Sequence, residues 1–383
     1  MAPGRGFAWP DERQELLLRV ALHDRDEALA AWRSWQVAAD LESVDAGSFR
    51  LLPFVFRRLE AWGCTEAAMP RLRGIYRQSW TRNAFLYRLL GPTLQGLRKA
   101  GIPVLLLKGV ALAHGVYRDH GARPMKDADV LVPPQHLAAA EEIAFATGWK
   151  WKQQEERPLW LDVRHLTAPT RHDLDLHHHV FHWDSRDETD AAFWAAAVPL
   201  EVQSVPCLAL CSADQLLHVL VHGMNWNPEP QIRWVADAAV TIVDAGPALD
   251  WDRLLAQARA RDLLAPVRAG LLYLAERLAV PVPPGVRRSL VSTRIGGAAR
   301  IELAVRQRGS DGVLGALPLL WFDYRRVRVA AGKPAGVGGF LRELRRALAP
   351  SGSGSLAAVL LRKAIRRLAG RRRERGRGGR PLP

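Results

Sequence analysis

Two aspartates, Asp127 and Asp129, stand two residues apart at the start of a short apolar stretch, residues 130–132. Because alternate residues of a β-strand point to the same face, we expect both carboxylates to project side by side. Like charges this close repel each other, and burying them without a cation is costly. A divalent metal with oxygen ligands is a natural compensation. The spacing therefore predicts a metal site on this strand.

A glycine turn precedes this acidic strand and could hold a phosphate group. Residues 104–107 predict a buried strand, and the chain then turns at Lys108 and Gly109 into a helical stretch. A helix N-terminus offers free N–H groups and a positive dipole end to an anion. Arg123, four residues before Asp127, could pair with phosphate oxygens through both arms of its guanidinium. Lys108 and Arg123 could instead serve only to balance the acidic residues.

A second acidic strand is predicted within residues 171–179, RHDLDLHHH. Asp173 and Asp175 share one face of it, and either could add a third carboxylate. Three carboxylates suit a pair of divalent metals that assist displacement at the α-phosphate of a nucleotide. His177 and His179 lie on the same face, so a zinc site is an alternative interpretation.

Other pairs of residues have a spacing of four. Two of these pairs could ligate zinc: Cys207 with Cys211, and His218 with His222. Both lie in apolar surroundings, where packing in the core is the simpler interpretation. Arg233 and Asp237 stand one helical turn apart and most simply form an ion pair within one helix.

The segments LLLKGVALAHGVY and ARPMKDADVLV together resemble the uncharacterised nucleotidyltransferase family of the DNA polymerase beta-like superfamily. In that family a Lys-Gly turn is followed by an Arg-Pro-x-x-Asp-x-Asp strand, and the resemblance covers about residues 80–275. It favours Asp175 over Asp173 as the third ligand, because Asp-Leu-His177 resembles the motif of the third strand. Val110 departs from the superfamily, which has serine there. A phosphate would therefore depend on backbone N–H groups, Lys108 or Arg123.

The resemblance also implies a reaction. Mg²⁺ or Mn²⁺ held by Asp127, Asp129 and Asp175 would bind the triphosphate of an NTP such as ATP. An acceptor hydroxyl on a small molecule, peptide or RNA would then attack the α-phosphate and release pyrophosphate. A hypothesis from another class is a catalytically weak nucleotide- or nucleic-acid-binding regulatory protein.

The regulatory hypothesis depends on the basic C-terminal end of the chain. Of the net charge of +15, residues 341–383 carry +11 and the other 340 residues only +4. This tail could bind nucleic acid or an anionic surface, or it could act as a solubilising segment. The basicity therefore says little about the folded body of the protein.

The predicted fold class is α+β, with a small mixed-sheet nucleotidyltransferase core between helical subdomains. Residues from 187 onward are expected to be helical, with a capping box at residues 212–215 opening one helix. The predicted segments are a helical N-terminal subdomain (1–101), the α/β core (102–185), a helical bundle (186–282), an irregular or helical region (283–354), and a basic amphipathic helix with a disordered tail (355–383).

The chain is expected to be cytoplasmic. Residues 1–14 lack the apolar core of a signal peptide, and no run of about 18 apolar residues exists to span a membrane. Three cysteines, Cys64, Cys207 and Cys211, form no disulfide framework, which fits a reducing compartment.

Overall fold

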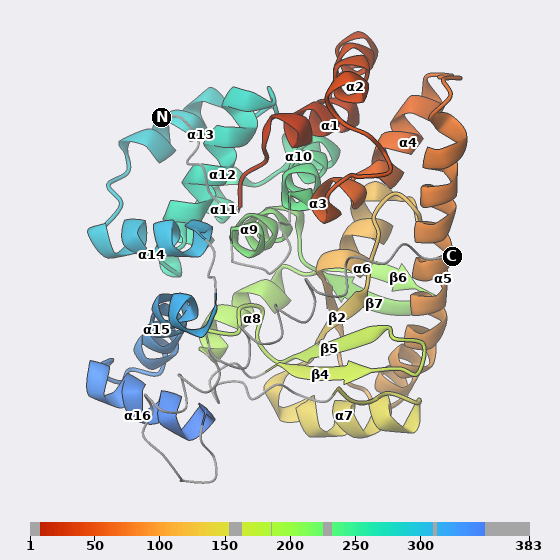
Figure 1. The fold of residues 1–383 in the computed structure, drawn as a ribbon. Coiled ribbons are helices and arrows are strands. Elements are labelled where there is room, and N and C mark those ends of the chain that lie inside the picture. Colours follow the sequence, from red (N-terminus) through yellow and green to blue (C-terminus); the bar gives the residue numbers. More distant parts are fainter. Residues whose placement is uncertain (1–7, 153–162, 185, 225–231, 309–311, 349–383) are drawn as a thin grey trace, which may run out of the picture.

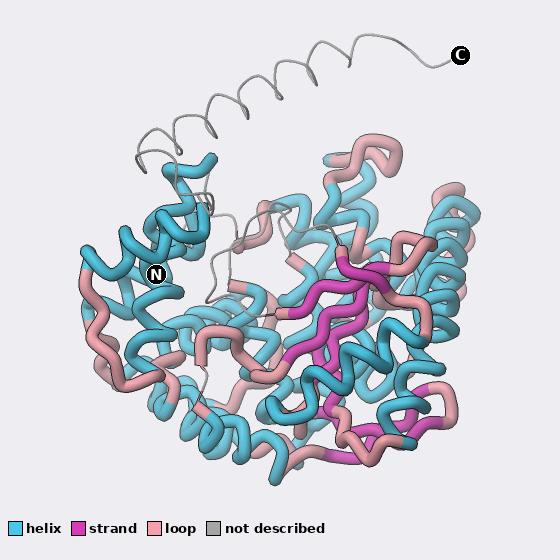
Figure 2. The backbone as a smooth tube through the Cα atoms, turned by 90° about the horizontal axis from the view of Figure 1, so that it is seen from below, coloured by secondary structure: helices cyan, strands magenta, loops and turns pink. Residues whose placement is uncertain are grey.

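A computed structural model describes residues 8–152, 163–184, 186–224, 232–308 and 312–348 (Figure 1). Within these residues the protein is a mixed α+β fold built on a seven-stranded sheet, so the predicted fold class is confirmed. Figure 2 shows the twisted strands enclosed by helices. Among the described residues, no helix is both long and apolar enough to cross a membrane.

The sheet has the strand order β3-β4-β5-β2-β1-β7-β6. The β2–β5 and β1–β7 pairs are parallel, and the other neighbouring pairs are antiparallel. In chain order the strands are β1 (Leu105–Leu107), β2 (Asp127–Leu131), β3 (Lys150–Trp151), β4 (Arg164–Thr167), β5 (Asp173–His177), β6 (Val198–Val202) and β7 (Val205–Ala209). The two strands predicted to be acidic, β2 and β5, are therefore central neighbours.

The two faces of β2 meet different cores. Ala128 and Val130 belong to a hydrophobic cluster that includes residues of α5 (Met69–Lys99) and α7 (Leu137–Ala146). Leu131 belongs to a second cluster that includes residues of α9 (Ser212–Gly223) and α10 (Arg233–Ala245). Because side chains alternate along a strand, Asp127 and Asp129 share the face of Leu131. The acidic residues therefore lie between the sheet and these later helices.

The helices before the sheet confirm the predicted helical character of residues 11–101. They are α1 (Glu12–Leu22), α2 (Arg25–Ala38), α3 (Ala46–Phe49), α4 (Leu52–Ala61) and α5 (Met69–Lys99). Pro92 lies inside α5, which continues through it. Buried residues of α1, α2 and α4 belong to the same cluster as those of four helices that follow the sheet, α9 to α12 (within residues 212–277), so the helices on both sides of the sheet in the sequence share one hydrophobic core.

Shorter helices connect the strands, and longer ones follow the sheet. They are α6 (Lys108–Leu112), the π-helix η1 (Ala113–Tyr117), η2 (Pro134–His136), α7 (Leu137–Ala146), α8 (Asp187–Ala195), α9 (Ser212–Gly223), α10 (Arg233–Ala245), η3 (Gly246–Ala248), α11 (Trp251–Ala260), α12 (Leu264–Arg277), α13 (Pro284–Ser292), α14 (Gly297–Arg308), α15 (Gly312–Ala330) and α16 (Val337–Leu348). The predicted basic helix and tail at 355–383 lie outside the described residues. The five-part domain division stays a prediction.

The β6–β7 hairpin corrects the prediction that the chain is helical from residue 187 onward. Gln203 and Ser204 join its two strands, with φ of 53° and 58°. Consecutive positive φ values are typical of the type I′ turn, whose twist matches that of antiparallel strands. The period-two apolar pattern of Val198, Leu200 and Val202 carried this signal in the sequence.

The predicted capping box at residues 212–215 is also wrong. Helix α9 has Cys211 as its N-cap, and no side chain caps it. Asp214, inside this segment, is fully buried and accepts a hydrogen bond of 2.6 Å from Arg253 Nη2 of α11. A long-range ion pair therefore joins the start of α9 to α11.

The contact between Gly223 and Trp234 provides a test of how α9 packs on α10. A Cβ added to Gly223 would lie 2.2 Å from Trp234 Cγ, so the indole would have to move. We expect Gly223→Ala to lower the free energy of unfolding by about 1–3 kcal/mol in urea denaturation, because overpacking outweighs the better helix propensity of alanine. Gly285→Ala in α13, where the added Cβ meets open space, is the matched control. Equal stability of the two variants would contradict this packing.

Candidate active site

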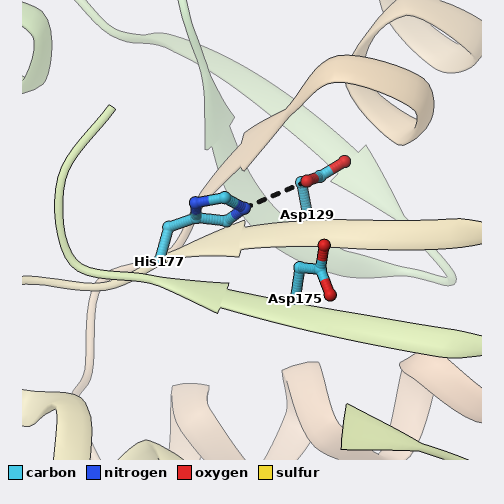
Figure 3. Close-up of side chains that lie close together, drawn as sticks. All are labelled: Asp129, Asp175 and His177. Carbon is cyan, nitrogen blue, oxygen red and sulfur yellow. Dashed lines mark hydrogen bonds and ion pairs between the residues drawn. The ribbon is translucent and has the colours of Figure 1, made fainter. Parts of the chain in front are cut away.

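The register of β2 and β5 places their acidic residues directly beside one another. Asp129 lies opposite Asp175, and Leu131 lies opposite His177. One ligand atom from each of Asp129, Asp175 and His177 lies within 4.8 Å of the others (Figure 3). Asp127, two residues before Asp129 on β2, lies opposite Asp173. The structure therefore brings together carboxylates that are 46 residues apart in the sequence.

Asp129 is the most deeply buried of these carboxylates and is held by two cationic or polar partners. Only 2% of its surface is exposed. Its Oδ1 accepts a hydrogen bond of 2.5 Å from Lys108 Nζ and lies 3.0 Å from His177 Nε2. Burial alone would raise the pKa of Asp129, but Lys108 and His177 hold that pKa well below its ordinary value. Asp129 is therefore ionised in the fold.

Lys108 is the counterpart of this pair. Burial works to lower its pKa, but the charges of Asp129 and Asp127 raise the pKa above its ordinary value. Its backbone adopts φ of 46°, in the left-handed region that non-glycine residues rarely occupy. The turn thus directs a charged ammonium onto the acidic strand.

Asp127 is in the opposite electrostatic situation. Burial and the neighbouring charge of Asp129 raise the pKa of Asp127, and Lys108 only partly offsets them. The site therefore holds more negative charge than its single lysine balances. A divalent cation would supply the missing positive charge.

The two candidates for the third carboxylate have different partners. Asp173 is neutralised by Lys152, whose Nζ lies 2.6 Å from Asp173 Oδ2. Asp175 contacts His165 Nδ1 at 2.7 Å and lies in the group with Asp129. This geometry favours Asp175, as the family resemblance does. The assignment of metal ligands stays a prediction.

The donor set fits a divalent ion. Carboxylate oxygens are the preferred ligands of Mg²⁺ and Mn²⁺, and an imidazole nitrogen also suits transition metals. The Lys108 ammonium, bound to Asp129, shows that a positive charge is already favoured at this point. His177 entered the sequence analysis only as a zinc ligand, although the strand alternation already placed it on the acidic face. His165 had no such signal, because the pairing of β4 with β5 cannot be read from the sequence.

The residues of the other zinc interpretations do not form such a group. Within the described part of the chain, Asp129, Asp175 and His177 are the one set of three potential ligands close enough to share an ion. Burial raises the pKa of Cys207 to about 11, so this thiol stays protonated. Burial lowers the pKa of His218 to about 3, and its ring is stacked 6.0 Å from that of His222.

Gly109 of α6 packs against Arg123, which lies in the segment before β2. A Cβ on Gly109 would lie 2.9 Å from Arg123 Nη1 and 2.8 Å from Met125 Sδ, so these two side chains would have to shift to accommodate a larger residue. Arg123 is 5% exposed, and its Nε and Nη2 donate to the two carboxylate oxygens of Asp237 at 2.9 and 2.8 Å. The bidentate partner of Arg123 is thus a carboxylate of α10, and the expected phosphate contact stays a prediction.

The expected ion pair between Arg233 and Asp237 within α10 is confirmed, although Asp237 has closer partners. Arg233 Nε lies 3.9 Å from Asp237 Oδ2, which is an ion pair but not a hydrogen bond. The closer partners of Asp237 are Arg123 and Tyr117, whose hydroxyl donates at 2.9 Å. Asp237 therefore links α10 to the segment between α6 and β2.

Comparison with known proteins gives this site its context. Residues 46–279 match the sequence model of a family described as uncharacterised nucleotidyltransferase. The chain belongs to this nucleotidyltransferase family. The match includes the acidic strands, the lysine-glycine turn and α9 to α12, and confirms the resemblance seen in the motifs.

No curated protein matches the chain. Among solved structures, the antibiotic-resistance factor ANT(2'')-Ia aligns over 51% of this chain and 98% of its own, with 10% sequence identity and a TM-score of 0.33. A similarity of this size carries no argument about the site.

The opposite electrostatics of Asp127 and Asp129 predict opposite effects on stability without metal. Asp129→Asn leaves the buried Lys108 ammonium with a neutral partner and should lower the free energy of unfolding by about 3–5 kcal/mol. Asp127→Asn removes a repelled, partly buried charge and should raise the free energy of unfolding by about 0.5–2 kcal/mol. Urea denaturation in EDTA at pH 7 measures both, and a shift of the same sign in the two variants would refute this account.

The destabilising effect of Asp129→Asn should also depend on pH. The folded-state pKa of Asp129 is depressed, so its stabilising effect is complete above the unfolded pKa of about 3.9 and is lost as the pH falls through the folded pKa. The gap in stability between wild type and Asp129→Asn should therefore narrow below about pH 4. A gap that widened there would contradict the depressed pKa.

Proposed function

We propose that this protein transfers a nucleoside monophosphate from an NTP to an acceptor hydroxyl with the help of a divalent metal. The observation that carries the proposal is the in-register placement of Asp129 beside Asp175, with Asp127 one step away on the same face. Membership in the nucleotidyltransferase family supports the same reaction class.

Asp127, Asp129 and Asp175 would hold the metal, with His177 close enough to join them. When bound, Mg²⁺ or Mn²⁺ would supply Lewis acidity that lowers the pKa of the acceptor hydroxyl and offsets charge on the α-phosphate. The acceptor oxygen bonds to the α-phosphorus, the bond to the β-phosphate oxygen breaks, and pyrophosphate leaves. The hydroxyl proton passes to solvent.

Lys108 would change partners during this reaction. Its ammonium is bound to Asp129 and 22% of its side chain is exposed, so it can turn toward an anion without crossing the core. A cation that binds Asp129 would release Lys108, which then has a charge free to pair with the phosphates. Metal binding and nucleotide binding are therefore coupled through this one side chain.

Transfer itself can be tested with α-³²P-labelled NTPs, Mg²⁺ and a cell extract as the source of acceptor. We expect the wild type to form a labelled product with at least one NTP. Asp175→Ala should reduce its rate by at least about 100-fold, because losing a metal ligand costs more than losing a supporting residue. EDTA should abolish the product.

Asp173→Ala is the matched control for this experiment. Asp173 lies on the same strand face, two residues away, but is paired with Lys152 outside the metal group. It should retain most of the rate. Equal losses in Asp173→Ala and Asp175→Ala, or labelling that persists in EDTA, would rule out the proposed site.

A further inference from the structure

Just before the acidic strand β2, two arginines share one aspartate of α10. The ring of contacts around Asp237 contains Arg123 and Arg233, two cations, against one carboxylate. The charged ends are largely buried: the side chains are 5%, 18% and 6% exposed for Arg123, Arg233 and Asp237. A buried guanidinium without a full anionic partner is costly. This cluster therefore has a surplus of positive charge.

Arg233 carries that surplus. Arg123 already makes two hydrogen bonds to Asp237, whereas Arg233 only approaches it at 3.9 Å. In the described part of the chain, the one hydrogen bond of the Arg233 side chain runs from Nη1 to the carbonyl oxygen of Pro124, at 2.5 Å. Arginine has five N–H donors, so most of its hydrogen-bonding capacity is left for another acceptor.

The surrounding charges add to this imbalance. Burial and the neighbouring charge of Arg123 lower the pKa of Arg233 to about 10, and Arg50 at the end of α3 acts in the same direction. The fold thus disfavours the charged form of a residue that is charged at neutral pH. An anion placed against Arg233 would reverse this penalty.

Arg233 also lies beside the candidate metal site. Its side chain donates a hydrogen bond to the carbonyl oxygen of Pro124. Pro124 stands three residues before Asp127, the first residue of β2. The charge of Arg233 lowers the pKa of Asp127, and His222 of α9 lies within electrostatic range of Lys108, Asp129 and Arg233 at once. If a metal takes up the charge of Asp127, Arg233 loses that partial compensation and favours an anion more strongly.

We propose that Arg233 binds the phosphate groups beyond the α-phosphate of the NTP, or the pyrophosphate formed from them. The inference rests on the proposed transferase function for the identity of its anion. The planar guanidinium can meet two phosphate oxygens at once. Arg123 then acts as a positioning residue, because it keeps Asp237 occupied and leaves Arg233 for the ligand.

Binding of inorganic pyrophosphate, measured by titration calorimetry with and without Mg²⁺, tests this site without any acceptor. Wild type should bind it, and Arg233→Met should weaken the affinity by about 10- to 100-fold, the usual value of a charge-assisted hydrogen bond. Arg233→Lys should fall between them, because lysine keeps the charge but loses the fork. If Arg233→Met does not fold, as judged by circular dichroism, Arg233→Lys decides the question.

Arg118→Met is the matched control. Arg118 is 66% exposed and pairs with Asp244, which lies on α10 as Arg233 does. Loss of the Arg118 charge should therefore leave pyrophosphate affinity unchanged. Affinity equal to wild type in the Arg233 variants, or no pyrophosphate binding by wild type, would overturn the inference. The transferase proposal fails separately, if Asp175→Ala still transfers the label.

Discussion

The ion pair between Lys108 and Asp129 is the interaction on which the rest of the site depends. It places a lysine in a left-handed backbone conformation, which costs about 1–2 kcal/mol for a residue other than glycine. It also buries a carboxylate next to two others. Removing either partner would leave the other charge without compensation, which for a buried pair costs about 3–5 kcal/mol. The turn before α6 and the acidic strand β2 are therefore held together by charge.

Around this pair, the sheet separates two chemical environments. One face of β2 and β5 is wholly apolar and packs against residues of α5 and α7, which gives the strands a fixed register. The opposite face carries the carboxylates and is covered by α9 and α10. A slip of one residue would bury Asp129 in the apolar core, so packing on one side enforces the acidic geometry on the other.

The helical half of the protein contributes charge to the site as well as cover. Asp237 of α10 anchors Arg123 and Tyr117 from the segment before β2, and Arg233 grips the backbone at Pro124. These contacts join residues 109 to 120 positions apart along the chain. They leave a positive charge next to a negative one, an arrangement that suits a metal together with a phosphate anion.

Local patterns in the sequence determined the α+β class, the two acidic strands and the lysine-glycine turn, because alternation and turn chemistry act over a few residues. They failed for the β6–β7 hairpin, whose pattern is short, and for the capping box, because the N-cap position of α9 is one residue earlier, at Cys211. Only the tertiary structure decided which residues meet: Asp175 with Asp129, His177 in their group, and Arg123 with Asp237. The physical reason is that these pairings depend on the order of the strands in the sheet and on how the helices pack against it. Both are determined by the burial of apolar side chains across the whole fold, and not by a few neighbouring residues.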